Sequence, residues 1–167
     1  MKLSPLLQDD LRHLMAAEGW IELGDAAEAQ AELAQVDSDF NDHPMVLAVR
    51  WRIHAKLKQW EECVEAARDL TQVAPNDADG WINHAYALHE LKRTQEAWDA
   101  LSPVAEKFPK VAIIPYNLAC YACQLGNLPV AQLMLEVASK IDGTKRIKSM
   151  ALKDKDLEPL WEQIRGA

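Results

Sequence analysis

Two cysteines separated by two residues, Cys120 and Cys123, lie in the stretch NLACYACQLGN at residues 117–127. This spacing occurs in redox motifs and in zinc sites, where the thiolates act together. On a helix it would place both sulfurs on one side, with His89 of a neighbouring helix able to approach Cys123. No second matching pair accompanies them. We therefore interpret both cysteines as small buried hydrophobic residues, with a thiol or metal protein that uses Cys120 and Cys123 as the alternative.

Other patterns typical of catalysis are missing from the sequence. It contains no Gly-rich phosphate loop, no His-Glu-x-x-His helix and no serine in a nucleophile elbow. The five histidines are scattered, and none has an evident carboxylate partner. Carboxylate pairs such as Glu61-Glu62 fall on charged helical faces, where solvation explains them. We predict a protein that is not an enzyme and that has no cofactor and no metal.

The overall charge restricts the class of partner. The 167 residues suit one domain with a sizeable core, and 49% hydrophobic content with 26% charged residues is ordinary for a folded chain. The formal net charge of −8 argues against nucleic acid or an anionic membrane as the main partner, because both require a basic face. Another protein is the partner that we expect.

The cysteine count and the N-terminal segment indicate a compartment. Three cysteines, an odd number, make no disulfide framework. The segment MKLSPLLQDD reaches acidic residues before the apolar region of a signal peptide could form. No apolar run approaches the roughly 20 residues that a membrane-spanning helix needs. We expect a cytoplasmic protein without membrane insertion.

An internal repeat organises the chain. Ala29, Cys63, Ala97 and Ala131 are each 34 positions apart, and each lies shortly after a turn-like segment. Helical periodicity extends almost everywhere, and no alternating apolar run is long enough for a strand. We predict an all-α chain of four helix pairs with a terminal cap. The predicted boundaries within one domain over residues 1–167 are 10–43, 44–77, 78–111 and 112–145 for the pairs and 146–167 for the cap.

These units resemble the tetratricopeptide repeat (TPR) family, which has a large residue early in its first helix, small residues where helices touch, and a closing proline. The third copy matches most clearly. The fourth has Pro115 where the large residue belongs, and the first is degenerate, with an insertion before Pro44. The resemblance implies a right-handed α-solenoid with a C-terminal capping helix. The matching residues of the third copy are Trp81, Ala85, Ala97, Leu101 and Pro109.

The resemblance also implies a binding function. In this family the first helices of the pairs line a concave groove that binds extended or helical segments of other proteins. The resemblance therefore implies a scaffold or adaptor. The alternative is a secretion-type chaperone for exported clients, which P-x-L-x-P-like segments in the clients would distinguish. The groove residues that the repeat frame implies are Met45, Val49, Arg52, Asp79, Asn83, Tyr86, Glu90, Ile113, Tyr116, Asn117 and Cys120.

The chemistry of this set indicates the ligand. Asn83 and Asn117 occupy equivalent positions in consecutive copies of the repeat, so their amides could bind the backbone of an extended peptide in a row. Tyr86 and Tyr116 would add rigid contact area. Acids outnumber bases, which favours a basic or apolar-anchored segment over one that ends in a carboxylate. A purely structural role for these Asn and Tyr side chains is the alternative.

Three local features depart from a regular repeat. Pro103 falls inside the second helix of the third copy and should kink it. In the tail, Asp156 is the expected N-cap of a helix with Pro159 in its first turn. Trp60 and Trp98 lie on second helices, where exposure would mark a further contact surface or a homodimer interface.

Overall fold

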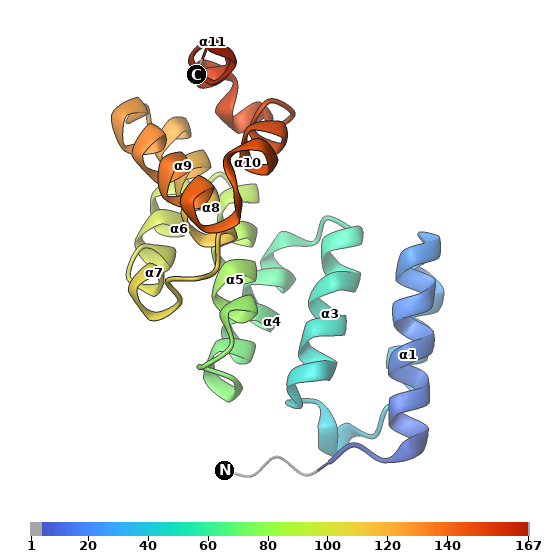
Figure 1. Ribbon diagram of the computed structural model, residues 1–167. Helices are drawn as coiled ribbons and strands as arrows, with labels where there is room; N and C mark the ends of the chain where they lie inside the picture. The colour runs from blue at the N-terminus through green and yellow to red at the C-terminus, as the bar shows by residue number, and fades with distance from the viewer. Residues whose placement is uncertain (1–4, 167) are drawn as a thin grey trace. The chain divides into compact units, whose positions relative to one another are not determined.

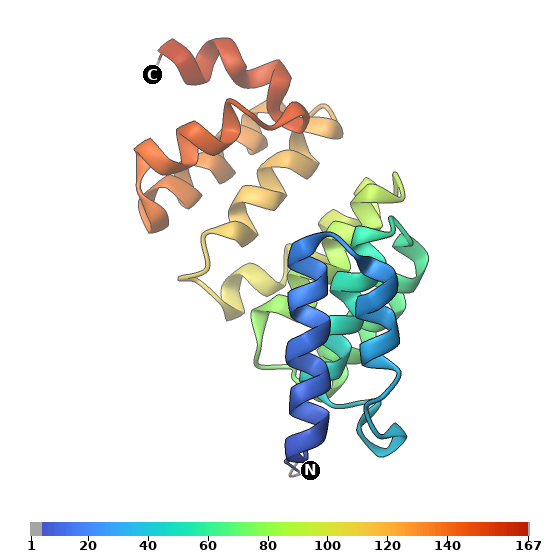
Figure 2. The same ribbon diagram turned by 90° about the vertical axis from the view of Figure 1, so that its right-hand side faces the viewer.

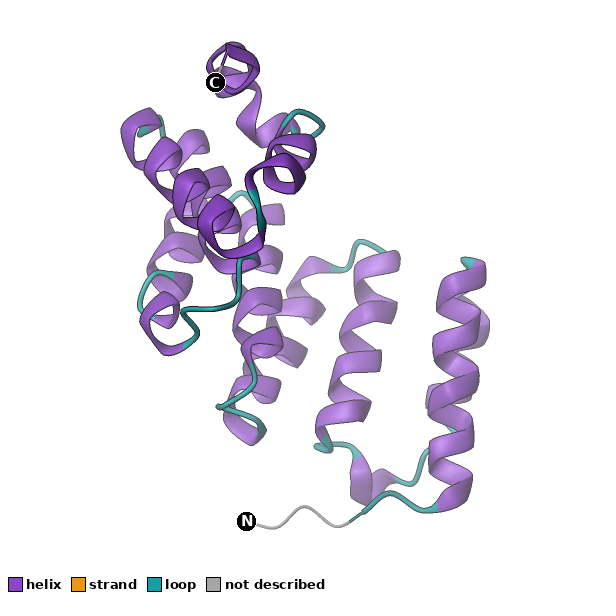
Figure 3. Cartoon of the chain, viewed as in Figure 1, coloured by secondary structure: helices purple, strands orange, loops and turns teal. Residues whose placement is uncertain are grey.

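The structure, a computed structural model, describes residues 5–166. Every regular element in this range is a helix (Figure 3), so the all-α prediction is confirmed. None of these helices combines the length and the apolar character needed to cross a membrane. The elements are α1 (Gln8–Leu23), α2 (Ala26–Leu33), η1 (Ser38–Phe40), α3 (Pro44–Lys56), α4 (Trp60–Val73), α5 (Ala78–Glu90), α6 (Thr94–Leu101), α7 (Val104–Lys107), α8 (Ile113–Gln124), α9 (Leu128–Asp142), α10 (Thr144–Ala151), η2 (Lys155–Leu160) and α11 (Trp161–Gly166).

Consecutive helices pair with one another. In Figure 1 and Figure 2, α1 lies antiparallel to α2, and the same arrangement holds for α3 with α4 and for α8 with α9. The four small residues of the 34-residue pattern, Ala29, Cys63, Ala97 and Ala131, are each 0% exposed. Small side chains therefore occupy four fully buried positions of the repeat, where close packing leaves little room for larger ones.

The chain forms two compact units, one that ends at Ala87 and one that begins at Leu88, so that the division falls inside α5. We call them the N-terminal unit and the C-terminal unit. Each has its own buried apolar residues. The N-terminal core cluster consists of Leu14, Ala17, Ile21, Ala29, Val46, Val49 and Ile53. Buried residues of the C-terminal unit include Leu101, Leu118, Tyr121, Leu157 and Leu160.

A left-handed backbone position recurs in the turn inside each helix pair. The φ angles are 87° at Gly24, 56° at Lys58, 63° at Lys92 and 80° at Gly126. Each of these positions is separated from the next by the interval of the repeat. Glycine adopts this conformation freely, whereas a residue with a Cβ atom does so at a cost of roughly 1–2 kcal/mol. The conformation at Lys58 and Lys92 is therefore imposed by the packing of the helix pairs.

Pro103 interrupts the second helix of the third pair. α6 ends at Leu101 and α7 begins at Val104, so the expected kink is confirmed and amounts to a complete break. Proline lacks the N–H group that would continue the helical hydrogen bonds, and its ring collides with the preceding turn.

The C-terminal segment differs from the single capped helix that the sequence predicts. α10, η2 and α11 follow one another, and the cap of η2 is Asp154, not Asp156. The Asp154 carboxylate accepts a hydrogen bond of 3.0 Å from the backbone N–H of Asp156. The two aspartates are alike in sequence, and the prediction was wrong because the Asp156 carboxylate is used by His89 instead. Leu157 and Leu160 of η2 are fully buried.

A glycine pair tests the left-handed turns. We expect Gly126→Ala to lower the free energy of unfolding by about 1–2 kcal/mol, because the new Cβ strains a positive-φ position. Gly19→Ala, inside α1 and with no atom within 4 Å of the new Cβ, should instead raise it by about 0.5–1 kcal/mol. Urea unfolding followed by circular dichroism measures both, and similar effects at the two sites would contradict this account.

Candidate interaction surface

Residues at equivalent positions of the repeat lie together on α1 and α3 of the N-terminal unit. Arg52 of α3, a predicted groove residue, donates a hydrogen bond of 2.8 Å from Nη1 to Oε1 of Glu18 on α1. The two helices are neighbours in Figure 1. A partly exposed pair of this kind adds at most about 1 kcal/mol. The pair shows that two residues one repeat apart meet across α1 and α3.

The same two helices also have exposed apolar side chains. Met15 of α1 is 71% exposed and the predicted groove residue Met45 of α3 is 48% exposed, and Leu11 is also at the surface. Leu11 and Met15 are the first-copy equivalents of Met45 and Val49. Our sequence reasoning left the first copy out, although the same frame would have identified both residues. Methionine side chains adapt to irregular partners, so this surface suits an apolar ligand.

Tyr86 of α5 is held by two tryptophans. Its ring centroid lies 6.4 Å from that of Trp51 and 5.8 Å from that of Trp60, and the planes meet edge to face at 63° and 75°. Tyr86 remains 38% exposed. Trp60 is half-buried in this cluster. The Tyr86 ring thus packs against side chains of α3 and α4 and still reaches the surface.

The other groove residues predicted in the N-terminal unit differ in accessibility. Val49 is buried in the core cluster. Asp79 is exposed in the first turn of α5, where its backbone N–H donates to Oδ1 of Asp77 at 3.0 Å. Desolvation of the carboxyl, together with the charge of Asp77, raises the pKa of Asp79. Asn83 is half-buried on the same helix.

In the C-terminal unit, the chain's own tail covers two predicted groove residues. The hydroxyl of Tyr116 donates to Oδ2 of Asp154 at 2.9 Å, and the Cys120 thiol donates to the same oxygen at 3.5 Å. Both side chains are only 5% exposed. Among the other predicted residues of this unit, Ile113 is exposed, and Glu90 and Asn117 are half-buried.

His89 secures the same tail. Its Nε2 lies 2.9 Å from Oδ2 of Asp156, and its Nδ1 lies 3.0 Å from the hydroxyl oxygen of Thr94. The imidazole also packs against the ring of Tyr121, with centroids 4.9 Å apart. Gln124 donates to the backbone carbonyl of Asp156 at 2.8 Å. We call the contacts of Asp154 and Asp156 with Tyr116, Cys120 and His89 the C-terminal latch.

Burial makes the cysteines poor candidates for thiol chemistry. All three are buried, and burial, with a smaller effect of Glu62, raises the pKa of Cys63 to about 12. Burial and the nearby Asp154 and Asp156 also raise the pKa of Cys120 and of Cys123. Nucleophiles and metal ligands are thiolates. Within residues 5–166, no three His, Cys, Asp or Glu side chains are grouped as a metal site would require.

Solved structures of TPR proteins share this fold. A thermophilic TPR protein of Thermus thermophilus, TTC0263, is 18% identical with a TM-score of 0.75, and the match covers 93% of this chain and 82% of that one. The 41-end segment of MamA from Desulfovibrio magneticus RS-1 is 16% identical with a TM-score of 0.73, over 97% and 94% of the two chains. A further MamA structure is 16% identical with a TM-score of 0.70, over 89% of each chain.

Comparisons of sequence give no match: no protein-family model and no curated protein matches this chain. The structural similarity to solved proteins of 16–18% identity shows the fold of this chain and nothing finer. The chain therefore has the tetratricopeptide-repeat fold that its 34-residue pattern predicts.

The latch can be tested by a double-mutant cycle. We expect Asp154→Ala to lower the free energy of unfolding by about 2 kcal/mol, because it removes a helix cap and leaves the buried Tyr116 hydroxyl without its acceptor. Tyr116→Phe in the Asp154→Ala background should cost less than in the wild type, because the two side chains interact. Lys153→Ala, at the neighbouring position, serves as the control. Strictly additive effects in urea unfolding would exclude a direct coupling between Asp154 and Tyr116.

Thiol reactivity tests the alternative based on cysteine. At about pH 8, we expect the native protein to react with a chromogenic disulfide reagent far more slowly than a free thiol does, because buried, protonated thiols are unreactive. Unfolding in urea should release all three thiols at once. A fast phase in the native state that corresponds to Cys120 or Cys123 would revive the thiol hypothesis.

Proposed function

We propose that this chain is a non-enzymatic adaptor that binds a segment of another protein on the exposed face of its first helices. We call this surface the helix-A face, where helix A is the first helix of each pair. It consists of Leu11, Met15, Met45, Asn83 and Tyr86 with the Glu18–Arg52 ion pair. The observation that supports the proposal is the combination of exposed apolar side chains on α1 and α3 with an exposed tyrosine on α5 that packs against two tryptophans. The similarity to solved TPR proteins supports a protein-binding scaffold in general.

The side chains of this face favour a particular kind of segment. Exposed Met and Leu side chains provide contact for apolar anchors, and Tyr86 loses little entropy on binding because Trp51 and Trp60 already hold it. The amide of Asn83 can donate to and accept from a peptide backbone. Net negative charge on the chain favours basic residues beside the apolar anchors. We propose an apolar-anchored segment with basic flanks as the ligand.

The C-terminal unit contributes less than its sequence predicts. Tyr116 and Cys120 contact Asp154, so they bind no partner while the C-terminal latch is closed. Glu90, Ile113 and Asn117 remain candidate contact residues of this unit. In the N-terminal unit, the buried Val49 supports the helix-A face from the core.

Capture experiments with matched variants test the proposal. Immobilised wild type should retain a partner from native lysate, and Met45→Glu should reduce retention by about tenfold or more, because a charge replaces an exposed apolar contact of the face. Asn83→Ala/Asn117→Ala tests the amides. The matched control is Leu57→Glu, which places the same charge at a similarly exposed residue, 41% against 48%, just beyond the end of α3. Circular dichroism checks that each variant is folded.

The outcomes separate the hypotheses. Loss of the partner in Met45→Glu with retention in Leu57→Glu supports the helix-A face. Equal retention by all variants would place binding elsewhere. Competition by a synthetic P-x-L-x-P peptide would favour the secretion-chaperone alternative over a general adaptor.

A further inference from the structure

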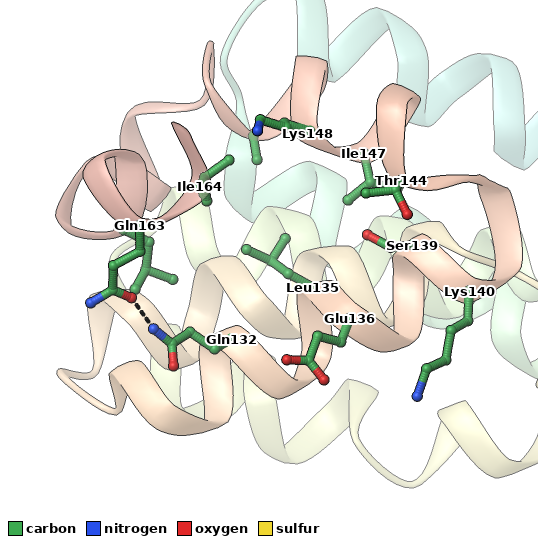
Figure 4. A pocket seen from close by; sticks show the side chains of 12 residues that line it. Gln132, Leu135, Glu136, Ser139, Lys140, Thr144, Ile147, Lys148, Gln163 and Ile164 are labelled. Carbon is green, nitrogen blue, oxygen red and sulfur yellow. Dashed lines mark hydrogen bonds between the residues drawn. The ribbon is translucent and has the colours of Figure 1, made fainter. Parts of the chain in front are cut away.

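A cleft of about 650 Å³ lies within the C-terminal unit, between α9, α10 and the segment that ends in α11. Figure 4 shows Leu135 of α9 in the middle, with Ile147 of α10 on one side and Ile164 of α11 on the other. Gln132 and Gln163 are hydrogen-bonded to each other at one end. The volume falls in the range of sites that bind ligands in proteins.

The cleft exists because α10 is short. α9 has 15 residues and α10 only 8, so α10 measures about 12 Å and α9 about 22 Å at 1.5 Å per residue. In helical repeats, the apolar face of each pair is covered by the helix that stacks on it. Here α10 covers only part of α9, and the chain then turns away into η2. The space left over has helical walls.

The lining of the cleft is apolar at depth and polar at the edge. Ile147, Ala151 and Leu160 are buried and form part of the lining. Ile164 and Ser139 are half-buried, so they can contact an occupant directly. This arrangement accommodates a few apolar side chains that enter from one side, with polar groups around them.

Charge around the cleft differs from charge elsewhere in the chain. Residues 132–166 contain seven Lys or Arg and six Asp or Glu. Residues 1–131 contain eleven Lys or Arg and twenty Asp or Glu. Asp142 forms an ion pair with Arg146 at 3.1 Å, and Lys148 donates to the backbone carbonyl of Arg165 at 3.5 Å. Lys140 and Lys148 line the cleft, with Glu136 as its one acidic lining residue. The lining of the cleft therefore has two cationic side chains and one anionic side chain, on a chain whose net charge is −8.

We propose that this cleft binds a short amphipathic helix of a partner protein, with apolar residues on one face and acidic residues beside them. The helical walls and the missing length of α10 favour a helix of about two turns as the occupant. Lys140 and Lys148 favour acidic flanks, and the acidic remainder of the chain repels such a helix from other surfaces. This surface is separate from the helix-A face and calls for a ligand of opposite charge.

A designed peptide provides the first test. The probe is a fluorescein-labelled, capped helical peptide of about 12 residues with Leu at positions i, i+4 and i+7 and Glu on both flanks, and the reference replaces each Glu with Lys. By fluorescence anisotropy, the full-length protein should bind the Glu peptide saturably and the Lys peptide at least about tenfold more weakly. Equal binding of the two peptides would overturn the proposal.

Variants locate the binding. Ser139→Trp should abolish binding by filling the cleft from a half-buried polar position, and Lys140→Glu/Lys148→Glu should weaken it by about tenfold or more. Lys92→Glu/Lys110→Glu makes the same charge change outside the cleft and should leave binding unchanged. If Ser139→Trp fails to fold by circular dichroism, the two charge-reversal variants decide the question.

Two results would contradict the proposal. Equal weakening by both charge-reversal variants would show attraction to net charge without a site. Saturable binding of lauric acid that displaces the peptide and is itself abolished by Lys140→Glu/Lys148→Glu would identify a site for a small anionic amphiphile instead of a helix.

Discussion

Close approach of helix backbones at the fully buried small residues Ala29, Cys63, Ala97 and Ala131 is the constraint on which the rest of the structure depends. A helix pair buries only one face by itself, so its apolar surface must be shared with neighbouring helices. The pairs can share it only if bulky side chains stay away from the points of contact. The same packing imposes the left-handed turn at Lys58 and Lys92, where a lysine adopts a conformation that glycine would adopt freely.

A constant packing interface also determines which side chains face outward. Equivalent positions on α1 and α3 meet as the ion pair of Glu18 with Arg52, and the next equivalent position on α5 is Tyr86. The interface is repeated, but the outward residues are free to vary. An acid, a base and a tyrosine occupy the same register, so binding specificity can change without loss of the fold.

The fourth helix pair, α8 with α9, poses a separate physical problem, because no further pair of the repeat packs on it within residues 5–166. On α8 the cover is η2, whose Leu157 and Leu160 are buried. Asp154 and Asp156 hold this segment by hydrogen bonds with Tyr116, Cys120 and His89. On α9 the cover is incomplete because α10 is short. Both the C-terminal latch and the proposed helix-binding cleft thus arise from how the segment after α9 packs on the fourth helix pair.

The sequence by itself determined the features that repeat: the helical class, the 34-residue period, the small contact residues and the break at Pro103, because each has a local signature. Tertiary structure alone decided the rest. Asp156 meets His89 across 67 residues and Asp154 meets Tyr116 across 38, and neither interval belongs to the repeat. The position of the tail depends on where Leu157 and Leu160 become buried, which no periodicity encodes. Tyr116 and Cys120 therefore look like groove residues in sequence, whereas in the folded chain they hold the tail.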